Sequence, residues 1–179
     1  MELPIPTPDD PRARLGHHLA THQAGAALAM STAQRARAAE EGTDLGRALA
    51  TFLDELEDER DTLRRAQRAL DLEPAGVVGV VRTATDGARR LLHLATTARR
   101  TPLTRVLELE VLVTGVTGKM RVWEVLGELA DQEPDLPDVD WEALVVRARG
   151  QREVLLAHHR QAAREAFAIA APSAADDPG

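Results

Sequence analysis

Two histidines and two glutamates stand where a helical protein could use them as metal ligands. His22 and Glu59 fall on stripes of apolar residues with helical spacing. His159 flanks another such stripe, and Glu110 lies towards the edge of a third. Imidazole and carboxylate groups suit iron, manganese and zinc. These four residues therefore form a candidate metal site, in which His22 and Glu59 are expected at similar heights along the protein, as are Glu110 and His159.

The spacing of these residues departs from that of an established di-metal centre. In a helical bundle, such a centre takes one glutamate from each of two helices and a Glu-x-x-His motif from each of the other two. The motif works because residues three apart share a helix face. Here Glu59 is followed three residues later by Thr62, and Glu153 precedes His158 by five. An ordinary ferritin site is not predicted, and the cofactor stays open between iron, manganese or zinc and none.

Glu59 also allows an interpretation without a metal. A charge buried without a partner costs several kcal/mol, so Glu59 is expected to pair with His22 or with Arg152 and to fix the register of the helices. Both alternatives remain open: a degenerate His/carboxylate metal site, or a metal-free core in a scaffold that binds another protein.

The run 114–119 looks like a phosphate-binding lysine loop, but it lacks the required gap between glycines and falls within a predicted helix.

Four long helices are predicted to position these side chains. N-cap oxygens come from Asp10, from Thr43 or Asp44, from Thr101 and from Asp140, and prolines follow two of them at the first helical position. The predicted helices run from 11 to about 41, from 44 to the residue before Pro74, from 102 to a break at 132–138, and from 141 to the residues before Pro172. A shorter amphipathic helix is predicted over 74–95.

Leucine, valine and alanine form the stripes that these helices are expected to bury. The apolar stripe of the last predicted helix continues through Ala162 and Ala166 to Ile169. Gly115 and Gly118 on the third long helix either permit close approach of a neighbour or cause a mild kink. Alanine-rich stripes on the first and last helices either bring helices close or leave room for a small ligand.

The order of the helices predicts the fold. Helices of these lengths would be about 40–47 Å long at ~1.5 Å per residue, so they can bury their stripes only against each other. Short connections join the first two and the last two, and a long segment separates the pairs. We therefore expect an all-α, antiparallel four-helix bundle with one long, helix-containing crossover, as in ferritin-like proteins. The expected domains are a flexible N-terminus over 1–10, one bundle over 11–170, and a disordered tail over 171–179.

Two segments carry a resemblance to a known family. The run Pro102–Glu110, continued by Gly115, Gly118-Lys119 and Trp123, together with the acidic run 57–63, resembles an uncharacterised actinobacterial family of ferritin-like helical proteins. The resemblance covers residues 14–168. It implies a ferritin-like bundle, and it implies no particular activity.

Composition narrows the classes of partner. The formal charge of −7 argues against a nucleic-acid partner, which requires a basic surface. No apolar run has the roughly 20 residues of a membrane span, and the N-terminal stretch lacks the apolar core of a signal peptide. The chain has no cysteine, which excludes thiol chemistry. A cytoplasmic protein that forms a homodimer or binds a protein partner is expected.

Overall fold

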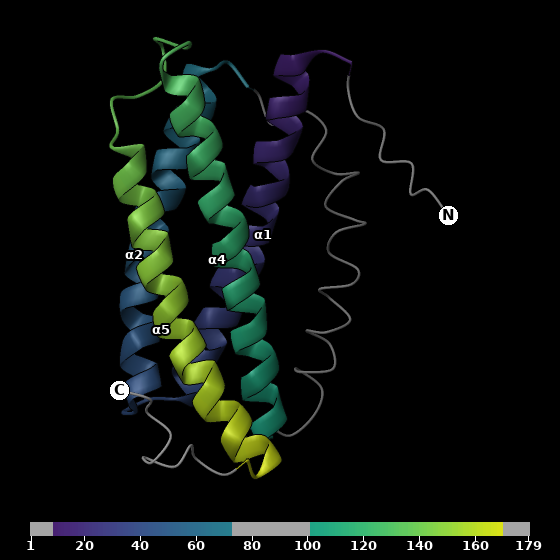
Figure 1. Cartoon of the computed structure of the whole chain (residues 1–179), viewed down its shortest axis with the longest axis vertical. Coiled ribbons are helices and arrows are strands. Elements are labelled where there is room, and N and C mark those ends of the chain that lie inside the picture. Colours follow the sequence, from purple (N-terminus) through teal and green to yellow (C-terminus); the bar gives the residue numbers. More distant parts are fainter. Residues whose placement is uncertain (1–8, 73–100, 170–179) are drawn as a thin grey trace, which may run out of the picture.

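The computed structural model describes residues 9–72 and 101–169, and these residues are helical apart from short connections (Figure 1). The all-helical prediction is confirmed for this part of the chain, in which no strand occurs. The helix predicted over 74–95 and the tail predicted over 171–179 lie outside the described residues, as do residues 1–8 of the predicted flexible N-terminus. The helices are α1 Pro11–Ala39, α2 Asp44–Ala69, α4 Pro102–Ala130 and α5 Trp141–Phe167.

Side-chain caps begin all four helices where the sequence predicts them. Each cap oxygen accepts a hydrogen bond from the backbone N–H three residues on, which satisfies one of the free donors of a first turn. At α4 the cap is reciprocal, because the Thr104 hydroxyl also accepts from the Thr101 backbone N–H. The four N-caps are Asp10, Thr43, Thr101 and Asp140.

The ends of two helices differ from the prediction. The second helix ends at Ala69, several residues before Pro74, and Asp71 adopts a positive φ of 52°. The last helix ends at Phe167 because Ala168 takes the left-handed conformation. Ile169 then lies outside the helix and is 55% exposed, so its prediction as a core residue is wrong.

Each of the four helices packs against two of the others. The neighbours are α1 with α2, α1 with α4, α4 with α5, and α2 with α5. One contact shows that α1 and α2 are antiparallel. The Arg12 guanidinium donates to the Leu70 carbonyl, which joins the start of α1 to the end of α2. Figure 1 shows α2 and α4 running in the same direction, each with its first residue at the same end of the bundle.

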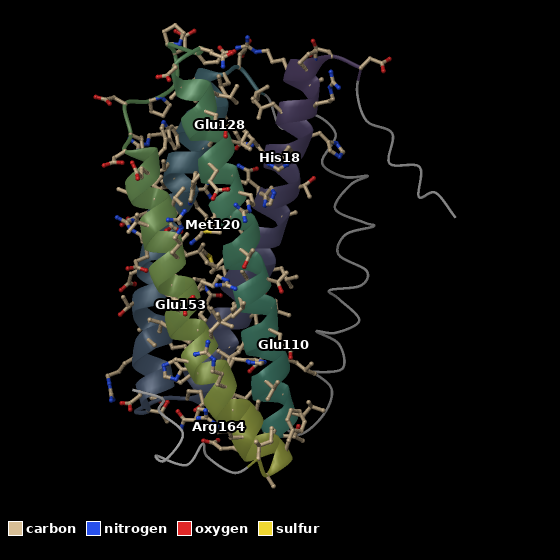
Figure 2. The ribbon with its side chains drawn as sticks, viewed as in Figure 1. His18, Glu110, Met120, Glu128, Glu153 and Arg164 are labelled. Atoms are coloured by element: carbon tan, nitrogen blue, oxygen red, sulfur yellow. The ribbon has the colours of Figure 1, made fainter. Side chains whose placement is uncertain are left out.

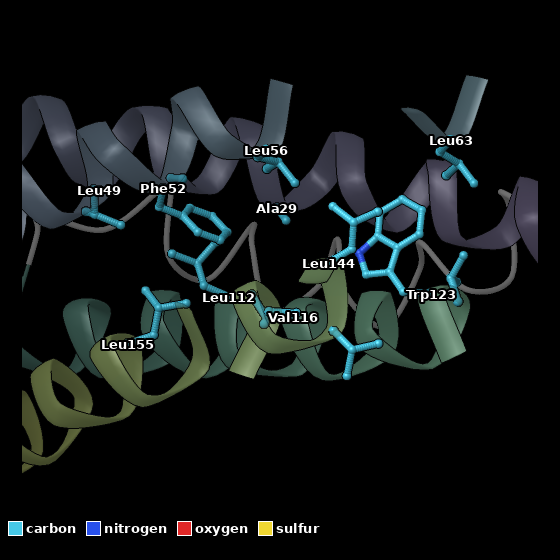
Figure 3. Close-up of a cluster of buried hydrophobic side chains, with 14 of the residues drawn as sticks. Ala29, Leu49, Phe52, Leu56, Leu63, Leu112, Val116, Trp123, Leu144 and Leu155 are labelled. Atoms are coloured by element: carbon cyan, nitrogen blue, oxygen red, sulfur yellow. The ribbon is translucent and has the colours of Figure 1, made fainter. Parts of the chain in front are cut away.

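The core consists mainly of leucine, valine and alanine, as composition predicts. Figure 3 shows Phe52 and Leu56 of α2 pointing toward the α4 side, where Leu112 and Val116 lie. Trp123 is 1% exposed and lies 6.2 Å from Trp141, measured between ring centroids. Within the described ranges, no helix combines the length and apolar composition that crossing a membrane requires.

Candidate functional site

A cavity of about 260 Å³ lies between α1, α2 and α4. Its walls are mostly apolar, and α5 contributes no lining residue. The cavity is partly open to the protein surface, because Gly25 and Thr114 of its lining are exposed. The apolar side chains that line it are Ala26, Ala29, Phe52, Leu56, Leu63, Val116, Val122 and Trp123.

Small residues on α1 and α4 produce this cavity. A Cβ atom at Gly115 would lie 3.5 Å from the Ala29 Cβ, and one at Gly118 would lie 3.1 Å from the His22 Cε1. An added Cβ would make ordinary van der Waals contact with Ala29 at Gly115 but would crowd the His22 ring at Gly118, so close approach is supported at Gly118. Gly25 and Ala26 also line the cavity from α1. Because these side chains are so short, they leave space that the longer side chains of α2 do not fill.

An ion pair forms part of the polar cavity wall, which also includes His22 and Arg60. The Lys119 Nζ donates hydrogen bonds to Glu59 Oε2 and to Gln151 Oε1. The Gln151 amide in turn donates to Glu55 Oε2 at 2.8 Å and to Glu59 Oε1 at 3.2 Å. The side chain of Glu59 is 1% exposed and that of Lys119 is 13% exposed. This network joins α2, α4 and α5, and both members of the ion pair line the cavity.

Burial shifts the pKa of two basic groups on the cavity wall, Lys119 and His22. Desolvation lowers the pKa of Lys119, and the attraction and hydrogen bond of Glu59 offset only part of that effect. Desolvation lowers the pKa of His22 to about 4, with a smaller contribution from His18. The His18 and His22 rings meet edge to face, with centroids 4.6 Å apart. At neutral pH the imidazole of His22 is therefore uncharged.

The partner predicted for Glu59 is wrong. Its hydrogen bonds go to Lys119 and Gln151, whereas the Arg152 Nη1 contacts Glu153 and the His22 ring faces the cavity without contacting Glu59. Helical spacing could not reveal this partner, because Lys119 comes from another helix. One signal was present in the sequence: Lys119 is the single lysine of a chain with 22 basic residues.

The four predicted ligands lie as two separate pairs. His22 and Glu59 line the same cavity, and the His159 Nε2 lies 3.2 Å from Glu110 Oε1 on the outside of α4 and α5. The predicted heights are thus correct within each pair. Figure 2 shows how far apart the pairs are, since His18, one turn before His22, and Glu110 lie towards opposite ends of the bundle. Among residues 9–72 and 101–169, no three histidine or carboxylate side chains gather as a metal site would require.

The fold and the site define a class of protein: an all-helical bundle with an apolar cavity between three helices and a buried lysine–glutamate pair in the cavity wall. No protein-family model, curated protein or solved structure matches this chain.

Proposed function

We propose that this protein binds a small, mostly apolar molecule in the cavity between α1, α2 and α4. The observation that carries the proposal is the combination of volume and lining: about 260 Å³ bordered largely by alanine, leucine, valine and aromatic side chains. Ligand sites in proteins are typically apolar cavities with a few placed polar groups. Here those groups include His22, Lys119, Glu59 and Arg60.

The cavity volume limits the size of the ligand. An engineered cavity of about 150 Å³ binds benzene, so 260 Å³ has room for roughly ten non-hydrogen atoms. If each atom contributes roughly 0.5 kcal/mol, between the values for very small and drug-sized ligands, the binding free energy is about −5 kcal/mol. That corresponds to a Kd on the order of 0.2 mM.

A metal centre built from His22, Glu59, Glu110 and His159 has less support than ligand binding. Glu59 is already held by Lys119, and the second pair lies away from the cavity. The ferritin-like arrangement with one long crossover remains our proposal for the topology. It is supported by the parallel directions of α2 and α4, because α2 ends at one end of the bundle and α4 begins at the other (Figure 1).

Intrinsic fluorescence offers a direct test of binding. The chain has two tryptophans and no tyrosine, and Trp123 lines the cavity. In the Trp141→Phe variant, Trp123 is the sole strong emitter, and titration with 1-octanol is expected to change its emission saturably. At ligand concentrations near ten times Kd, the same alcohol should stabilise the fold by about 1.4 kcal/mol.

Two results together would refute the proposal. The first is that the emission of Trp123 does not change saturably with any of a series of alcohols and arenes. The second is that the same compounds leave the Tm unchanged. The Trp123→Phe variant is the matched control, because its remaining Trp141 does not line the cavity and should respond much less.

A further inference from the structure

We propose that Lys119 bonds covalently to its ligand, so that the cavity captures an apolar aldehyde as an imine on the Lys119 Nζ. This inference rests on the proposed function, because the aldehyde must first enter the cavity. It adds a chemical class of ligand and a bond-forming residue. The geometry that supports it is a primary amine, an acid–base partner and an apolar cavity at one place.

The position of Lys119 supports this inference. Lys119 and Glu59 both line the cavity, and the Lys119 Nζ lies 5.6 Å from the centroid of the Phe52 ring, another part of the wall. A ligand carbonyl that lies against Phe52 would therefore be within reach of the amine. Two of the three donors of the ammonium group are used, by Glu59 and Gln151.

The residue type at position 119 also supports this inference. Every basic residue of this chain other than Lys119 is an arginine, apart from the histidines. A guanidinium would supply the same charge to Glu59 and a more rigid set of hydrogen bonds. It cannot lose its proton at any ordinary pH, however, and so cannot attack a carbonyl. Position 119, beside the buried Glu59 carboxylate in the cavity wall, thus holds a basic residue that can act as a nucleophile.

The reaction balances without any other reactant. The Lys119 ammonium gives one proton to the Glu59 carboxylate, and the freed nitrogen lone pair attacks the aldehyde carbon. Glu59 returns that proton to the oxygen of the resulting carbinolamine. Glu59 then takes a second proton from the nitrogen and passes it to the hydroxyl group, which leaves as water. An aldehyde and an ammonium thus give an iminium and one water. The iminium keeps the positive charge beside Glu59, as the ammonium does now.

The electrostatic surroundings favour the first step. Burial lowers the pKa of Lys119, which raises the fraction of free amine above that of an exposed lysine. Charged groups face it from two packed helices: Glu55 and Glu59 from α2 raise its pKa, and Arg147 from α5 lowers it. His22 of α1, across the cavity, stays uncharged at neutral pH.

Reductive trapping tests the inference on the full chain. The protein is incubated with octanal and sodium cyanoborohydride at pH 7, and intact mass and peptide mapping locate any octyl group. The expected result is an adduct on Lys119 that is at least about tenfold more abundant than the adduct on the α-amino group. Saturating 1-octanol, which fits the same cavity but cannot form an imine, should reduce trapping at least about tenfold by competition.

The Lys119→Arg variant is the matched control, because it keeps the positive charge beside Glu59. It should show at least about tenfold less adduct than wild type, leaving only the α-amino group to react. An adduct at the α-amine alone, or trapping at Lys119 that 1-octanol does not reduce, would overturn the inference.

The same experiment separates the two proposals. If 1-octanol changes the Trp123 emission but octanal gives no adduct on Lys119, the covalent inference fails and ligand binding stands. If neither compound alters the emission and no adduct forms, both fail. The competition arm uses wild-type protein, so the conclusion does not depend on whether the arginine variant folds.

Discussion

Filling the cavity should make the protein more stable and prevent it from binding its ligand. Ala29 lines the cavity from α1 and is 6% exposed. The Ala29→Leu substitution adds three carbon atoms to its side chain. A cavity of about 150 Å³ holds the six carbons of benzene, so 260 Å³ has room for these three.

The expected magnitude follows from transfer and entropy. Burying three more methylene-sized groups at about 0.8 kcal/mol each contributes ~2.4 kcal/mol. Fixing the leucine rotamer costs about 0.5–1 kcal/mol. The net gain is about 1.5 kcal/mol, which should raise Tm by roughly 3–6 °C in a chain of this length. Affinity for 1-octanol should fall at least about tenfold, since the added side chain occupies the ligand's space.

Ala33 provides the matched control, because it lies one turn further along the same helix and does not line the cavity. It is fully buried, so Ala33→Leu forces extra atoms into dense packing and should destabilise by about 1–3 kcal/mol. Differential scanning calorimetry measures both variants, and fluorescence titration measures binding. Equal destabilisation by the two substitutions would refute the cavity as a site with free space. A stabilised Ala29→Leu variant that still binds 1-octanol as wild type does would refute it as the binding site.

Two further predictions concern the polar groups of the cavity wall. Lys119→Met should lower the free energy of unfolding by about 3 kcal/mol, because Glu59 loses its cation while remaining buried. Urea unfolding measures this, and a loss below about 1 kcal/mol would contradict it. The pKa of His22 is about 4 in the folded protein and near 6.5 otherwise, so the unfolded chain binds more protons between these values. The stability from neutral His22 is therefore complete above pH 6.5 and is lost as pH falls towards 4. His22→Gln should show a smaller drop in urea midpoint between pH 7 and pH 4.5 than wild type, and equal drops would contradict the role of His22.

The helix starts could be predicted because their signals are local. An N-cap oxygen and its N–H acceptor lie within one turn, and Asp10 and Thr101 each precede a proline that has the backbone geometry of a first helical residue. The positions of helix ends are harder to predict, because the spacing of apolar residues does not reveal where the backbone leaves the helical conformation. The pattern that includes Ile169 continues past Ala168, where the left-handed backbone ends the helix.

The candidate site could be predicted only in part, because it depends on contacts between helices. Spacing placed His22 and Glu59 on interior faces, and both do line the cavity. It could not show that Lys119 reaches Glu59 from α4, since the two positions are 60 residues apart. The cavity also depends on how α1 packs against α4, where Ala29 faces Gly115 and His22 faces Gly118. The apolar stripe of one helix does not reveal how far the neighbouring helix lies from it.

Stability alone does not account for the ion pair in the cavity wall. Replacing a buried pair by apolar residues of similar volume is often neutral or stabilising, whereas removing one partner is costly. The Glu59→Leu/Lys119→Met double variant should therefore recover most of the stability lost by Lys119→Met alone. It should still bind 1-octanol, because the apolar walls remain, and yet form no octanal adduct. If the double variant is as unstable as Lys119→Met, the hydrogen bonds through Gln151 stabilise the helices by more than the neutralisation of Glu59 by Lys119. The ion pair would then be primarily structural.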